Sequence, residues 1–101
     1  LIIEGEISLA IDEVTRAGKR KGVNFVSLTP KHTDEIKDPR FKILPIEMET
    51  DATYQALGEF LGSLDDLEKS SVTVEQFDIV ADAKNPVRLK ARIIIHMIFL
   101  R

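Results

Sequence analysis

The chain has 101 residues, of which 14 are basic and 17 acidic, so its formal net charge at neutral pH is −3. This balance argues against nucleic-acid binding, which needs a basic surface, and the lack of cysteine excludes disulfides, thiolate metal sites and cysteine nucleophiles. An apolar content of 44% is typical of a globular protein, so residues 1–101 are predicted to form a single domain.

The first predicted element is a helix over residues 2–21. Basic residues are concentrated in its last turn, where positive charge interacts favourably with the helix dipole. Gly22 is suited to the first position after the helix, which often adopts a left-handed conformation. The segment Gly18–Gly22 lacks the spacing of a phosphate-binding loop, so it is interpreted as a solvated helix end. The helical spacing is carried by the apolar residues Ile3, Ile7, Ala10, Ile11, Val14 and Ala17.

Two strands separated by a loop are predicted next. Residues 23–29 are rich in β-branched and aromatic side chains and stop at Pro30, which is typical of a strand. The polar residues 31–40 predict the loop, and residues 41–50 predict the second strand. Leu44, Ile46 and Met48 share one face of this strand, and a local irregularity is expected at Pro45, which has no N–H to donate.

A second helix is predicted over residues 52–69, with Asp51 or Thr53 as its N-terminal cap. Its buried stripe is expected to comprise Tyr54, Leu57, Phe60, Leu61, Leu64 and Leu67.

The last two predicted strands form a hairpin. Over residues 72–81 the apolar side chains change parity between Val74 and Phe77, which indicates a bulge near Glu75–Gln76. Asn85–Pro86 marks a turn. Residues 87–100 predict the longest strand, whose core face carries Val87, Leu89, Ala91, Ile93, Ile95, Met97 and Phe99.

The predicted element order is therefore α-β-β-α-β-β. Two amphipathic helices and four strands are best packed as an antiparallel four-stranded sheet with both helices on one face. The predicted fold class is α+β, a ferredoxin-like two-layer sandwich in circularly permuted order.

The sequence offers little catalytic chemistry. His32 and His96 lack any metal-ligand spacing, and His32, beside Asp34 and Glu35, is interpreted as a solvated loop residue. There is no nucleophile elbow and no glycine-rich phosphate loop. No catalytic, cofactor-binding or metal-binding residues are therefore predicted, and the chain is not expected to be an enzyme.

The face of the sheet without helices is more informative. One half is expected to hold Glu47 and Glu49 opposite Arg88, Lys90 and Arg92, as structural ion pairs. The other half carries several neighbouring apolar side chains, and soluble proteins rarely expose such a patch to solvent. We expect this half to be a partner interface, although the strand register could instead bury some of it at the end of the sheet. The predicted interface residues are Phe41, Ile43, Pro45, Ile94, His96 and Ile98.

One set of spacings extends over most of residues 10–100. It comprises Ala17, Gly22-Val23-x-Phe25-x-Ser27-Leu28-x-Pro30, Leu44-x-Ile46-x-Met48, Tyr54-x-x-Leu57-x-x-Phe60-Leu61-x-x-Leu64-x-x-Leu67, Val72-Thr73-Val74, Phe77-Asp78-Ile79 and Leu89-x-Ala91-x-Ile93. Together these motifs resemble the PilO family of type IV pilus assembly proteins. The chain departs from the family pattern by placing residues 50–53 where a glycine commonly precedes the tyrosine, and by having only Lys69 as the basic residue after the second helix.

The resemblance implies a scaffold with no catalysis and no cofactor. Proteins of this family have one membrane helix, a coiled coil and a ferredoxin-like domain in the periplasm. They pair with themselves and with a PilN-type subunit, contact a PilP-type lipoprotein, and align the inner-membrane platform with the outer-membrane pore. No apolar run here is long enough to span a membrane. Since the sequence begins at Leu1, we expect it to be a fragment whose membrane anchor lies upstream.

Two alternatives remain open at this point. The architecture and the departures from the family pattern also suit the related M subunit of type II secretion. A ferredoxin-like regulatory domain that binds a small metabolite is the other alternative, and a ligand-dependent thermal shift would favour it.

Overall fold

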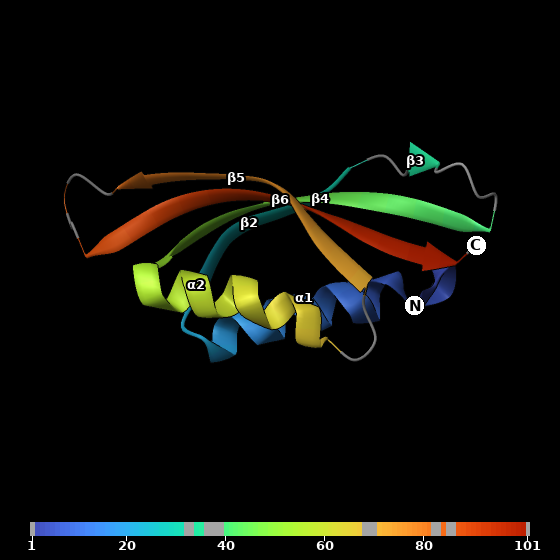
Figure 1. The fold of residues 1–101 in the computed structure, drawn as a ribbon, viewed down its shortest axis with the longest axis horizontal. Coiled ribbons are helices and arrows are strands. Elements are labelled where there is room, and N and C mark those ends of the chain that lie inside the picture. Colours follow the sequence, from blue (N-terminus) through green and yellow to red (C-terminus); the bar gives the residue numbers. More distant parts are fainter. Residues whose placement is uncertain are drawn as a thin grey trace.

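The computed structural model describes residues 2–31, 34–35, 40–67, 71–81, 84 and 87–100. These residues form an elongated body of 47 × 22 × 18 Å. Both helices lie on the same face of one sheet (Figure 1). The elements are β1 (Ile2–Ile3), η1 (Glu4–Glu6), α1 (Ile7–Arg20), β2 (Asn24–Pro30), β3 (Asp34–Glu35), β4 (Phe41–Thr53), α2 (Tyr54–Ser63), η2 (Leu64–Asp66), β5 (Ser71–Ala81) and β6 (Arg88–Leu100).

The long strands lie in the order β2-β4-β6-β5 and each pair is antiparallel. With two helices on one face, this arrangement confirms the predicted α+β fold, a ferredoxin-like sandwich in permuted order. The short strand β3 pairs with β4, and β1 pairs parallel with the end of β6.

Helix α1 begins later than predicted. Residues 2–3 are strand β1, and 3-10 helix η1 separates it from α1. Among the described residues β5 pairs with β6 as far as Ile98, and Ile2 and Ile3 pair with the next residues of β6, Phe99 and Leu100. At the other end of α1 the prediction is confirmed, because Gly22 has a φ of 88°. The amide of Gly22 donates to the Lys19 carbonyl and that of Val23 to the Gly18 carbonyl, the bonds of a Schellman cap.

Helix α2 is shorter than predicted and its buried stripe is different. Thr53 caps it by accepting a hydrogen bond of 3.1 Å from the Ala56 amide. Tyr54, expected in the core, is 75% exposed, and Ala56 is buried instead. At about 100° per residue, Tyr54 lies about 120° around the helix from Phe60 whereas Ala56 lies about 40° from it. Leu57, Phe60 and Leu64 are buried as predicted.

The core lies between the helices and the central strands. Leu44, Ile46 and Met48 of β4 are buried there, together with the odd-numbered residues from Ala91 to Phe99 of β6, as the alternation predicted. Phe25 and Phe60 meet edge to face, with ring centroids 5.6 Å apart. The buried hydroxyl of Thr50 donates to the carbonyl of Ala91.

The irregularity expected at Pro45 is absent. Strands β4 and β6 pair in continuous register through Pro45↔His96. The Pro45 carbonyl accepts from the Lys31 amide, on the side of β4 away from β6. In an antiparallel strand the N–H and C=O of one residue point to the same side. The N–H that Pro45 lacks would therefore face the β2 side, where β2 ends at Pro30, so no hydrogen bond to β6 is lost.

The predicted bulge in β5 is confirmed by a register shift between Val74 and Gln76. Val87, expected on the last strand, precedes it as an exposed turn residue. His32, Lys69 and the Asn85–Pro86 turn lie outside the described residues.

Candidate functional site: the outer face of the sheet

The helices leave one side of the sheet uncovered, which we call the outer face. Alternation along a strand puts the odd-numbered residues of β4 and the even-numbered residues of β6 on it. The register therefore places Ile43 opposite Ile98, Pro45 opposite His96, and Glu47 opposite Ile94. All of the predicted interface residues are thus brought together at one end of this face. We call them the apolar outer patch: Phe41, Ile43, Pro45, Ile94, His96 and Ile98.

Each side chain of the apolar outer patch is half-buried rather than fully exposed. Phe41 lies opposite Leu100, a residue that the sequence reasoning did not include, and the Arg40 guanidinium lies over the Phe41 ring, 5.5 Å from its centroid. None of the six is fully buried, so the interface stays a prediction. A half-buried apolar surface still gains free energy when a partner removes its remaining area from water, at about 25 cal/mol per Å².

His96 stands at the polar border of this patch. It lies between Pro45 on β4 and Thr73 on β5. Its Nδ1 is 3.6 Å from Oε1 of Glu75, the residue at the bulge. Glu75 in turn accepts a hydrogen bond of 2.9 Å from the Thr73 hydroxyl. The Glu75 carboxylate therefore lies beside the His96 ring but beyond hydrogen-bond distance.

The other half of the outer face is charged, as predicted, but its ion pairs are diagonal. Glu49 lies opposite Arg92 in the register, yet Arg92 pairs with Glu47. Arg88 pairs with Asp51 at 2.8 Å and also donates to the Asp51 carbonyl. Diagonal neighbours are within reach of long side chains across an antiparallel pair. The sequence reasoning missed Asp51, although its odd number places it on this face.

Glu47 of β4 links the end of β2 to β6 at the boundary between the two halves. Its carboxylate is 3.2 Å from the Lys31 ammonium, just after β2, and also contacts Arg92 on β6. The Lys31 hydrogen bond, together with the charges of Arg92 and Lys31, outweighs desolvation and lowers the pKa of Glu47 below its ordinary value of 4.5. Glu47 is therefore an ionised structural clamp, because a general acid would need a raised pKa.

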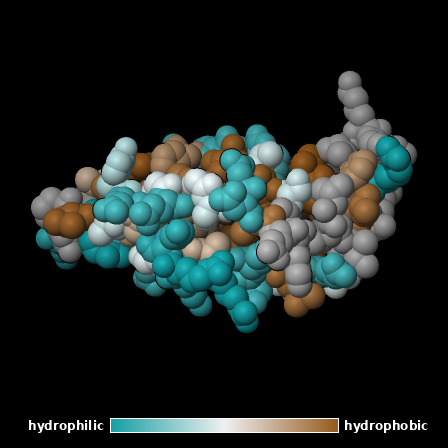
Figure 2. Space-filling view, turned by 60° about the horizontal axis from the view of Figure 1, so that its bottom comes forward, coloured by the Kyte–Doolittle hydropathy of each residue, from teal (hydrophilic) through white to brown (hydrophobic). Residues whose placement is uncertain are grey.

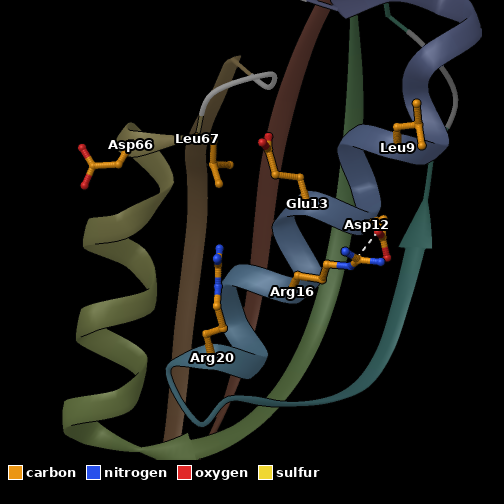
Figure 3. Close-up of a pocket in the computed structure, with 7 residues that line it drawn as sticks. All are labelled: Leu9, Asp12, Glu13, Arg16, Arg20, Asp66 and Leu67. Atoms are coloured by element: carbon orange, nitrogen blue, oxygen red, sulfur yellow. Dashed lines mark ion pairs between the residues drawn. The ribbon is translucent and has the colours of Figure 1, made fainter.

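The helix side of the molecule differs from the outer face. Figure 2 looks toward the helices and shows a mainly hydrophilic surface over them. A groove of about 620 Å³ lies between α1 and the end of η2, lined by Leu9, Asp12, Glu13, Arg16, Arg20, Asp66 and Leu67. In Figure 3 Glu13 and Arg20 extend from α1 toward Leu67, whereas Asp66 points away from them. Arg16 pairs with Asp12 of its own helix at 2.9 Å.

The described part of the chain has neither a metal-ligand cluster nor a membrane-spanning helix. It contains no group of three side chains that could hold a metal ion. Its helices are all too short or too polar to cross a lipid bilayer.

Comparison with protein families gives one match, to the C-terminal domain of PilO from the type IVa pilus alignment subcomplex, over residues 6–98. No curated protein sequence matches the chain significantly.

Comparison with solved structures agrees on the fold. A crystal structure of the type 4 fimbrial biogenesis protein PilO from Pseudomonas aeruginosa superposes with a TM-score of 0.85 at 20% identity, covering 100% of this chain and 73% of that one. The core region of PilO from the same organism superposes with a TM-score of 0.71 at 20% identity, covering 90% of this chain and 91% of that one. An Akkermansia muciniphila protein solved without its transmembrane region superposes with a TM-score of 0.79 at 11% identity, covering 96% of this chain and 56% of that one.

Proposed function

Because the chain belongs to the PilO family of the type IVa pilus alignment subcomplex, we propose that it is a non-catalytic scaffold domain in that subcomplex. The observation that carries this proposal is the apolar outer patch. It gathers half-buried apolar side chains from β4 and β6 on the face that no helix covers. A surface of this kind suits protein contact rather than chemistry.

The shape of the patch supports a protein partner. Its side chains stand on the two central strands of a continuous ladder, so their positions are fixed before binding. A rigid surface loses little conformational entropy when a partner docks. The ion-paired half beside it supplies charges at its border, the arrangement of an apolar centre with a polar rim that protein interfaces use.

The proposed partners are subunits of the same machine. The candidates are a second copy of this chain, a PilN-type subunit and a PilP-type lipoprotein. We place the domain in the periplasm of a bacterium, tied to the inner membrane by a helix upstream of residue 1. Support for this placement comes from the family match and from the related Akkermansia protein, which was solved without its transmembrane region.

Ile94→Asp tests the role of the patch. A carboxylate here would have to be desolvated in an apolar interface, so we expect loss of co-purification with the partner subunits from detergent-solubilised membranes. Val26→Asp is the matched control, because Val26 is an apolar residue of β2 outside the patch and 63% exposed. Both variants should keep most of their thermal stability. Unchanged partner recovery with folded Ile94→Asp, or equal loss in both variants, would reject the patch as the interface.

The location is tested separately with the native full-length protein. We expect it in the membrane fraction, with this domain cut by protease added to the periplasmic side of spheroplasts. Recovery in the soluble cytoplasmic fraction would overturn the scaffold proposal and favour a ligand screen.

A further inference from the structure

A hollow of about 400 Å³ lies in the charged half of the outer face. Its floor is backbone, since Thr50 of β4 pairs with Ala91 of β6 there and both side chains are buried on the covered face. Sites for small molecules usually measure about 300–1,000 Å³. The side chains around the floor are those of Val26, Glu49, Asp78, Val80, Lys90 and Arg92.

Two carboxylates border the hollow without a cation held between them. Arg92 stands between Glu49 of β4 and Asp78 of β5 in the register, and two strand spacings separate the two acidic residues by about 10 Å at the backbone. The Arg92 side chain contacts Glu47 instead. Asp78 accepts a hydrogen bond of 3.1 Å from the Gln76 amide, and Glu49 forms no ion pair with a described residue. Both carboxylates can therefore accept hydrogen bonds from a cationic group that enters the hollow.

Lys90 places a positive charge beside these carboxylates. Asp51 lies opposite Lys90 in the register, but it pairs with Arg88 at 2.8 Å. Lys90 therefore forms no ion pair with any residue that the structure describes. On its other side Lys90 lies opposite Val80 of β5, which is 67% exposed. The hollow thus combines an ammonium group, two carboxylates and an apolar wall.

We propose that this hollow binds a zwitterionic α-amino acid with a branched apolar side chain. The ammonium group of the ligand lies between Glu49 and Asp78. Its carboxylate contacts the Lys90 ammonium, and its side chain packs on Val80. A ligand with only one charge leaves either Lys90 or the carboxylates unpaired, so the charge pattern selects a zwitterion. Because water screens these exposed charges, the affinity is expected in the millimolar range.

The hollow is separate from the apolar outer patch, and the inference does not rest on the proposed function. The patch occupies residues 41–45 of β4 and 94–98 of β6, whereas the hollow lies over residues 49–50 and 90–92 of the same strands. The two sites share no residue. A chain that fails to bind protein partners through the patch could still bind the amino acid, and the reverse also holds.

Amide chemical shifts of the 101-residue chain test the site, with leucine as the probe. We expect leucine to cause saturable shifts at the amides of residues 26, 50, 80 and 91, around the hollow. N-acetyl-leucine lacks the ammonium group and leucinamide lacks the carboxylate, so each should bind several-fold more weakly. Glycine, which has no side chain to pack, should also bind more weakly. Absence of saturable shifts at high millimolar leucine, or equal binding of the blocked compounds, would overturn the inference.

Variants that remove one charge each locate the bound ligand. Lys90→Met and Glu49→Gln should each raise the dissociation constant for leucine several-fold, because each removes a charged contact. Lys19→Met is the matched control, since Lys19 is an exposed lysine of α1 that does not line the hollow. All three substitutions are at exposed residues, so the fold should be kept. Leucine binding that is unchanged in Lys90→Met and Glu49→Gln, or weakened equally by Lys19→Met, would contradict the proposed site.

Discussion

Strands β4 and β6 present two contrasting faces made from alternate residues of the same segments. On the covered face, Ile93, Ile95 and Met97 are fully buried beneath the helices. On the outer face, their chain neighbours Ile94, His96 and Ile98 are half-buried. The backbone is shared, so the two faces differ only in what lies above them. Substitutions on the covered face should lower the free energy of unfolding, and those on the outer face should mainly change binding.

The largest effect is expected for Phe60→Ala on the covered face. Phe60 is fully buried and packs edge to face on Phe25. Deleting a buried aromatic ring costs about 3–5 kcal/mol of unfolding free energy. A chemical denaturation curve measures it, and a loss below about 1 kcal/mol would mean that α2 does not pack as described.

Ile95→Ala and Ile94→Ala form a matched pair across the two faces. Truncating the buried Ile95 leaves a cavity and should cost about 2–5 kcal/mol. Truncating Ile94 removes a half-buried side chain and should cost clearly less, because solvent can fill the space. The difference between their denaturation midpoints is the readout. Equal losses would mean that the outer face is covered within the isolated chain.

Gly18→Ala should be costly because α1 approaches β2 closely there. An added Cβ would overlap the Phe25 ring. Overpacking of this kind costs about 1–3 kcal/mol. Gly58→Ala is the control, since nothing lies near its Cβ position in α2, and there alanine should stabilise by about 0.5–1 kcal/mol through helix propensity. Destabilisation of similar size in both variants would contradict the close contact.

The smallest effect is expected on the outer face, at Glu47. Its pKa is lower in the folded chain than the ordinary value of 4.5, because of Lys31 and Arg92. A carboxyl with a depressed folded pKa contributes stability above its unfolded pKa, and this is lost as pH falls through the folded pKa. Glu47→Gln should therefore lower the thermal midpoint slightly at neutral pH, and the difference from wild type should vanish in acid. A difference that grows as the pH falls would contradict the clamp.

How far the sequence could predict the structure depends on the length of each pattern. The alternation along residues 41–50 and 87–100 predicted both faces of the central strands, and the parity change after Val74 located the bulge. Helix α2 was predicted less well, because the spacing of apolar residues does not decide whether Tyr54 or Ala56 is the first residue of its buried face. Strand β1 could not be predicted, since two residues carry no periodicity and their pairing with Phe99 and Leu100 of β6 depends on the fold of the whole chain.

For the candidate site, the sequence predicted which residues lie on the outer face but not which side chains contact one another. Each apolar residue of the outer patch was identified from its parity alone. The diagonal pairing of Arg88 with Asp51, and of Arg92 with Glu47, depends on three-dimensional positions that a pattern of single strands does not contain. The half-burial of the patch likewise depends on side chains from neighbouring strands.

Photo-cross-linking in living, piliated cells tests the central claim most directly. A photoreactive residue would replace either Ile98, in the apolar outer patch, or Lys90, in the charged half of the same face of β6. The account predicts that the probe at position 98 yields an adduct with a subunit of the pilus alignment subcomplex and that the probe at position 90 yields much less. No adduct from position 98, or equal adducts from both positions, would contradict the assignment of the patch as the binding surface.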